Sequence, residues 1–166
     1  MATRPLRYFG DPILNSAAAP VARFDTQLAS LVRDMFDTMA AAGGVGLAAN
    51  QIGVARRVFV FDCQGMRGAL VNPVWRPLGQ ATQTGAEGCL SIPGVRAPVP
   101  RHADVLASGA DADGRAVTIR ASGLLARCIQ HETDHVDGVL FLARMEPQDR
   151  KAAMAAIRAA DWFQRP

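Results

Sequence analysis

Apolar residues recur every three to four positions in three stretches of the chain, a period that is typical of helices with one buried face. The first stretch covers residues 25–44, with Asp25 as a suitable N-cap and two glycines at its end. Its apolar positions are Leu28, Leu31, Val32, Met35, Phe36 and Met39. The second stretch covers 122–136, with Ser122 as a suitable cap, and the third covers 147–162 with proline in its first turn. The pattern therefore predicts three helices.

Shorter apolar runs between these helices predict strands. Residues 57–61 read RVFVF, which is typical of a buried strand. Residues 69–71 and 74–75 flank Asn72–Pro73, so we expect a short strand with a bend at that dipeptide.

Two further strands, 104–109 and 116–121, are joined through Asp113–Gly114, a pair that favours a hairpin turn. Residues 79–100 are rich in Gly and Pro, and we predict a long loop over residues 79–88. We find no repeat or linker, so we expect one domain over residues 1–166. Its fold class is α+β, with short, mostly antiparallel strands around a central helix, a helix in the N-terminal half and a C-terminal helix.

The second predicted helix carries the sequence HETDH, which fits the pattern H-E-x-x-H. Because residues four apart lie on the same face of a helix, His131 and His135 can point at one metal ion. Glu132 faces the same site and could take a proton from a water molecule bound there. The alternative is a chance match, but a Glu and two His on an otherwise apolar helix would be unfavourable without partners.

Two histidines need a third protein ligand. Downstream of His135, the position where some zinc proteases place a third His holds Phe141, and the only later Glu is Glu146. Upstream, Cys89 is a soft donor in the glycine-flanked sequence EGCLS, and Cys with two His leaves one position open for water. Cys63 and Cys128 compete with it, although Cys63 ends a strand and Cys128 lies one turn before His131.

The composition of the chain indicates in which compartment the protein acts and which partners it lacks. Three cysteines at irregular spacing do not form a disulfide framework, which favours the reducing cytoplasm. The net charge of +3 includes no dense basic run, so a nucleic-acid role is unsupported. No apolar run approaches the length of a membrane span, and we see no secretory signal at the N-terminus. We expect a cytoplasmic protein without membrane or direct nucleic-acid contacts.

Three segments together resemble the signature motifs of the peptide deformylase family. They are GVGLAANQ (44–51), EGCLS (87–91) and HETDH (131–135), and they occur in the family's order and at similar spacing. The resemblance covers nearly the whole chain. It implies hydrolysis of the N-formyl group from the formyl-methionine of nascent polypeptides, with release of formate. It also implies one divalent metal per chain, Fe(II) natively, with Zn, Ni or Co as other possible occupants.

The same resemblance implies a role for individual residues. Cys89, His131 and His135 bind the metal, and Glu132 acts as general base and then general acid towards a metal-bound water. Gln51 and the backbone N–H of Leu90 stabilise charge on the formyl oxygen. The implied methionine-pocket residues are Val45, Leu124, Arg127 and Cys128. Gly44 and Gly46 could also let a peptide backbone approach closely, although Gly43–Gly44 has the alternative role of ending a helix. Arg127 departs from the aliphatic residue common at its position, and its stem could line the methionine pocket while its guanidinium reaches water. The alternative is an exposed helix arginine.

Other functions remain to be weighed against this one. An H-E-x-x-H peptidase would lack a downstream ligand and would retain activity in Cys89→Ser. A non-catalytic relative would have lost Glu132 or Gln51, and a structural zinc domain would need a fourth ligand. Formyl-Met nascent peptides are the expected partners, the chain is expected to be a monomer, and ribosome association would be weak because the charges of the last helix nearly balance.

Overall fold

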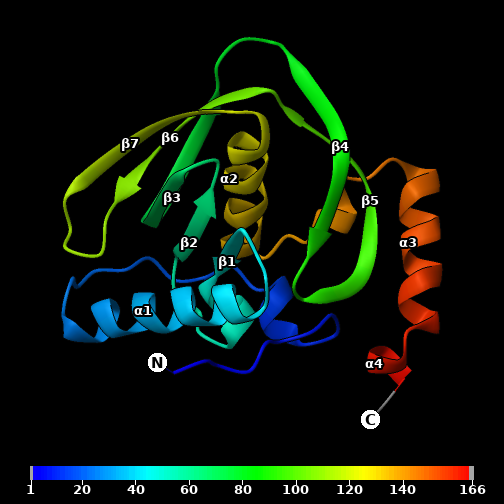
Figure 1. Ribbon diagram of the computed structural model, residues 1–166, viewed down its shortest axis with the longest axis horizontal. Coiled ribbons are helices and arrows are strands. Elements are labelled where there is room, and N and C mark those ends of the chain that lie inside the picture. Colours follow the sequence, from blue (N-terminus) through cyan, green and yellow to red (C-terminus); the bar gives the residue numbers. More distant parts are fainter. Residues whose placement is uncertain (1, 165–166) are drawn as a thin grey trace.

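The computed structural model describes residues 2–164, and its elements follow one another as Figure 1 shows. The helices are α1 (Thr26–Ala41), α2 (Gly123–Val136), α3 (Pro147–Ala159) and α4 (Asp161–Gln164), with short 3-10 helices η1 (Pro12–Asn15), η2 (Ala49–Ile52) and η3 (Phe141–Arg144). The strands are β1 (Gly46–Ala48), β2 (Val58–Cys63), β3 (Met66–Pro77), β4 (Thr82–Cys89), β5 (Ile92–His102), β6 (Asp104–Ala110) and β7 (Ala116–Ser122). Among the described residues no helix is long and apolar enough to cross a membrane.

Five strands form one antiparallel sheet in the order β1-β2-β3-β6-β7. Successive side chains of β2 point to opposite faces of this sheet. Phe59 and Phe61 belong to the cluster around α2, whereas Val58 and Val60 belong to the cluster around α1. This explains why residues 58–61 (VFVF) are apolar without interruption, since both faces of the strand are covered.

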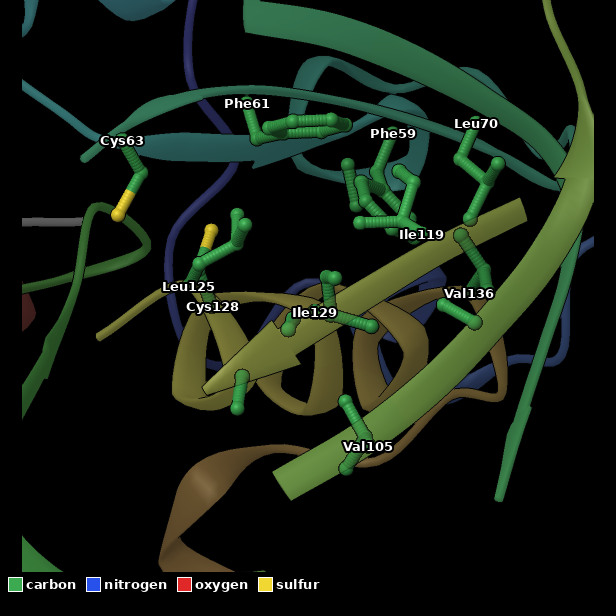
Figure 2. Close-up of a cluster of buried hydrophobic side chains, with 14 of the residues drawn as sticks. Phe59, Phe61, Cys63, Leu70, Val105, Ile119, Leu125, Cys128, Ile129 and Val136 are labelled. Carbon is green, nitrogen blue, oxygen red and sulfur yellow. The ribbon is translucent and has the colours of Figure 1, made fainter. Parts of the chain in front are cut away.

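Helix α2 lies between the sheet and the β4–β5 hairpin, near the centre of the molecule (Figure 1). Figure 2 shows Leu125, Cys128 and Ile129 of this helix turned towards side chains of β2 and β3. A further cluster joins the other side of the hairpin to α3, where Ile157 is fully buried. Residues 125–136 are all buried, so both the apolar and the polar side of the central helix are covered. The predicted α+β architecture around a central helix is confirmed.

The loop predicted over residues 79–88 is wrong from Thr82 onward, and the rest of the Gly- and Pro-rich stretch, where no strand was predicted, is also mostly strand. Residues 82–102 form a long two-stranded hairpin whose register runs from Thr82 opposite His102 to Cys89 opposite Ile92. Each strand of a two-stranded ribbon has one edge without a partner, so prolines such as Pro98 can occupy positions where no N–H is needed. Proline therefore does not exclude strand here, as it would in the middle of a sheet.

Two predicted helix ends also need correction. Ser122 lies at the N-cap of α2, but its side chain makes no capping hydrogen bond. Instead the Leu125 N–H donates to Oε1 of Gln64, which lies in the β2–β3 turn with φ of 53°. The last helix ends at Ala159, and α4 follows after a break at Ala160.

The expected bend at Asn72 is confirmed, with a positive φ and an irregular register between Val71 and Val74.

Candidate metal centre

Three side chains from two separate elements bring metal-binding atoms together. His131 and His135 lie one turn apart on α2, and their Nε2 atoms are 3.1 Å apart. Cys89, the last residue of β4, places its Sγ 3.2 Å from Nε2 of His135. The three ligand atoms all lie within 4.8 Å of one another. The hairpin thus supplies the soft donor that the helix lacks.

These donors suit a divalent transition metal. One thiolate and two imidazoles form an open three-ligand set, which leaves a coordination position for water or substrate. The other two cysteines are buried, and neither joins the converging group within residues 2–164. Sγ of Cys128 instead lies 3.7 Å from the Val45 carbonyl oxygen. The choice of Cys89 over Cys63 and Cys128 therefore agrees with the geometry.

Glu87 lies behind the metal-binding group and holds its first histidine. Its Oε1 is 2.6 Å from Nδ1 of His131, which leaves Nε2 of that ring facing the other donors. Burial acts to raise the pKa of Glu87, but hydrogen bonds from His131 and Arg101 outweigh it and hold this pKa well below its usual range. A carboxylate in this position fixes the orientation of a metal-binding ring.

Arg101 connects Glu87 to a second carboxylate. Its guanidinium donates to both Glu87 oxygens, at 3.2 and 2.7 Å, and to Oδ2 of Asp134 at 2.7 Å. Asp134 also accepts from Arg144 at 2.8 Å. Arg101 thus forms buried ion pairs with both Glu87 and Asp134, close to the metal-binding histidines. Sequence reasoning gave Glu87 no role, although its place in EGCLS, two residues before the cysteine ligand, was an available signal.

A cavity of about 520 Å³ opens in front of the metal-binding group, between α2, β1 and the hairpin. Its lining includes these residues expected at the site: Gly44, Val45, Gly46, Gln51, Cys89, Leu90, Leu124, Arg127, Cys128, His131 and Glu132. Val45 and Leu124 are 44% and 47% exposed, so apolar surface is presented to solvent at this cavity. The site residues that lie far apart in the sequence therefore share one cavity.

Glu132 reaches this cavity from a buried position. Its carboxyl group is close to Gly46, where a Cβ would collide with Oε1 and would lie 2.8 Å from Sγ of Cys128. Within the described residues its Oε2 has no hydrogen-bond partner. Burial raises the pKa of Glu132 to about 7, although the nearby His131 opposes this shift. A carboxyl group in this state can exchange a proton near neutral pH.

Gln51 is held with its amide nitrogen towards the metal-binding cysteine. Its Oε1 accepts from the Ala48 N–H at 2.8 Å, which fixes the orientation of the amide and of its donor, Nε2. Nε2 donates to Oγ of Ser91 at 3.1 Å and lies 3.7 Å from Sγ of Cys89. The side chain is 1% exposed, so a donor is fixed beside the cavity.

Arg127 differs from both sequence-based interpretations. Its side chain is 7% exposed, so it is neither an exposed helix arginine nor a residue whose guanidinium reaches water. Nη1 donates to Oε2 of Glu87 at 2.7 Å and to the Val99 carbonyl at 2.8 Å. A carboxylate and a carbonyl of the hairpin thus compensate Nη1 for the lost water, whereas the buried Nη2 has no hydrogen-bond partner among the described residues.

The sequence of the chain is similar to those of known proteins. The family model described as polypeptide deformylase matches residues 3–151. Peptide deformylase 1 of Corynebacterium efficiens is 63% identical, over 98% of this chain and 99% of that protein. The peptide deformylase of Acidothermus cellulolyticus is 53% identical, over 98% and 89%.

Solved structures share the fold. The peptide deformylase of Legionella pneumophila superposes with a TM-score of 0.90 at 39% identity, over 99% of this chain and 100% of that one. The peptide deformylase of Synechococcus elongatus in complex with actinonin gives a TM-score of 0.89 at 40% identity, over 100% and 92%. Sequence and structure comparisons thus identify one family across nearly the whole chain.

Proposed function

The chain belongs to the polypeptide deformylase family, and we propose which of its side chains carry out each part of that reaction. The enzyme is a metal-dependent hydrolase that removes the N-formyl group from formyl-methionine at the start of nascent polypeptides. The observation that carries this conclusion is the convergence of Cys89, His131 and His135 on one point beside the cavity.

Cys89, His131 and His135 are the metal ligands in this proposal. One divalent ion per chain, natively Fe(II), suits the thiolate and imidazole donors, which also accept Zn, Ni or Co. Bound there, the metal supplies Lewis acidity, which makes a water molecule acidic enough to react near neutral pH. Glu87 supports the site by holding the His131 ring through Nδ1.

Glu132 moves the proton. Its carboxylate accepts a proton from the attacking water and passes it to the amine nitrogen as the C–N bond of the formyl amide breaks. The burial of Glu132 and its pKa of about 7 support this exchange, because a general base works best when its pKa is near the working pH. The products are formate and a free α-amino group.

Gln51 and Leu90 stabilise the formyl oxygen as it gains negative charge. Nε2 of Gln51 already lies beside Cys89, and Leu90 follows that residue in the chain and lines the cavity. Fixed donors of this kind act most strongly on charge that develops during the reaction. The removal of one such donor lowers turnover by roughly 10²- to 10³-fold.

The substrate lies along the strand edge beside Gly44 and Gly46, where the absence of side chains lets a peptide backbone approach. Its methionine side chain occupies the part of the cavity lined by Val45, Leu124 and Cys128, together with the stem of Arg127. The exposed apolar surface of Val45 and Leu124 supports this placement, because a methionine would cover it.

The remaining assignments concern the setting of the enzyme. We propose a cytoplasmic monomer with one catalytic domain. Weak ribosome association would use the exposed face of α3, where Arg150, Lys151 and Arg158 line a shallow depression together with Met154. Basic side chains on an exposed helix suit a surface rich in phosphate.

Cys89→Ser tests the function against the peptidase alternative. Serine has nearly the same shape but a hydroxyl that does not ionise, so the variant should lose bound metal and formate release together. Cys63→Ser is the matched control and should keep both, since Cys63 lies outside the converging group. A Cys89→Ser protein that keeps its metal and its hydrolytic activity would refute the proposed ligand set and favour an H-E-x-x-H peptidase.

A further inference from the structure

Arg127 links the two halves of the metal-binding group. It belongs to α2, which carries both histidine ligands, and its guanidinium contacts both strands of the hairpin that carries Cys89. Nη1 donates to Glu87 on β4 and to the Val99 carbonyl on β5. Both acceptors and the guanidinium are buried, so these bonds form away from competing water.

The two oxygens of Glu87 are divided between different donors. Oε1 faces Nδ1 of His131 and Nη2 of Arg101, at 2.6 and 2.7 Å. Oε2 faces Nη1 of Arg127 at 2.7 Å, and Nε of Arg101 is farther away at 3.2 Å. Arg101 alone could hold the carboxylate as a fork, but Arg127 fixes the oxygen that is not used by the histidine.

The hairpin makes space for this arginine. Gly85 of β4 has no side chain, and a Cβ there would lie 3.4 Å from Nη2 of Arg127, in ordinary van der Waals contact. Any larger side chain at position 85 would occupy the volume of the guanidinium. The polar end of Arg127 is directed at the hairpin, where Nη1 makes its hydrogen bonds, so the stem is the part of this cavity-lining residue left to contact substrate.

From this arrangement we infer that Arg127 is a positioning residue, which fastens the Cys89-bearing hairpin to the histidine-bearing helix through Glu87 and Val99. The inference rests on the proposed metal ligands. Its consequence is slow metal loss, because the ligands can separate only when α2 and the hairpin move apart. Methionine recognition depends on Arg127 only through its stem.

The test measures zinc release from the zinc-loaded enzyme to an excess of a coloured chelator, without substrate. Arg127→Met keeps an unbranched stem but loses the charge and the donors, and should release zinc about tenfold faster, the lower end of the range for changes around ligands. Arg127→Lys keeps the charge next to Glu87 and should stay within about threefold of the parent. Arg67→Met, at an exposed arginine paired with Asp62, is the matched control and should not change the rate.

A second pair of variants tests the same contact from the hairpin side. Gly85→Val should displace the guanidinium and accelerate zinc release while Arg127 itself is unchanged. Gly85→Ala adds only a Cβ that fits, so its release rate should stay close to that of the parent. This pair keeps the inference testable even if Arg127→Met does not fold.

The outcomes separate the possible roles. Faster release in Arg127→Met and Gly85→Val, with KM for a formyl-Met tripeptide within about threefold of the parent, supports the positioning role. Unchanged release together with a raised KM would make Arg127 a substrate contact and overturn it. Equal release from the Met and Lys variants would reduce the residue to packing, which also overturns it. A parent enzyme that binds no zinc would instead refute the proposed ligands themselves.

Discussion

Gly46→Ala should disable the enzyme by displacing Glu132. A Cβ at this position would lie 2.8 Å from Sγ of Cys128 and would collide with Oε1 of Glu132, and both neighbours are buried side chains of α2. Neither can move far, so the carboxyl group must rotate out of its place by about 1 Å. A displacement of that size in a catalytic group lowers turnover by about 10²-fold, which is close to 2.7 kcal/mol.

The assay is steady-state formate release from a formyl-Met tripeptide, with metal content and melting temperature measured on the same preparation. We expect kcat to fall about 100-fold and one metal per chain to remain bound. Overpacking should also lower the free energy of unfolding by about 1 to 3 kcal/mol. Gly85→Ala is the matched control, because its Cβ meets only ordinary contacts, and it should keep kcat within about threefold.

Two results would refute this reasoning. An unchanged kcat would mean that Glu132 is not confined by Gly46 or does not move the proton. A large rise in KM at constant kcat would mean that the added methyl group blocks the peptide rather than the carboxyl group.

Three further outcomes are expected. Gln51→Ala should lower kcat by roughly 10²- to 10³-fold with metal still bound, since a donor to the formyl oxygen is lost; loss of metal as well, measured by elemental analysis, would give Gln51 a structural role instead. Burial, assisted by the charge of Asp62, raises the pKa of the Cys63 thiol. The unfolded chain therefore ionises first, and denaturant titrations should show stability falling as the pH rises from about 8.5 towards the folded pKa, with a shallower decline in Cys63→Ala. Gln64→Ala removes the acceptor of the Leu125 N–H and should destabilise the fold by about 1 kcal/mol in the same titrations, whereas an unchanged midpoint would show that the cap contributes nothing.

The parts of the fold that follow from local sequence were predictable. Helical spacing placed His131 and His135 on one face of a helix, and the structure confirms this element almost to the residue. Asp25 caps α1 as expected, because a cap depends only on neighbours within three residues. The hairpin of β6 and β7 was found from its turn residues for the same reason.

The hairpin of β4 and β5 was missed because Gly and Pro usually end strands. Their meaning depends on whether a strand has one partner or two, and this is a property of the tertiary structure. Arg127 was misjudged for a related reason. Its acceptors, Glu87 and Val99, lie 40 and 28 residues away, so no local pattern could show that its guanidinium would be buried and paired.

The most direct test of the account is formate release from a formyl-Met tripeptide by protein purified without oxygen and loaded with iron, measured beside its Glu132→Gln variant. We predict rapid release by the parent, suppressed by a hydroxamate chelator. Glu132→Gln should lose about 10²- to 10⁴-fold of that rate while one metal per chain remains bound. No release from parent protein that contains one metal per chain would contradict the deformylase activity, and an active Glu132→Gln variant would contradict the role of Glu132.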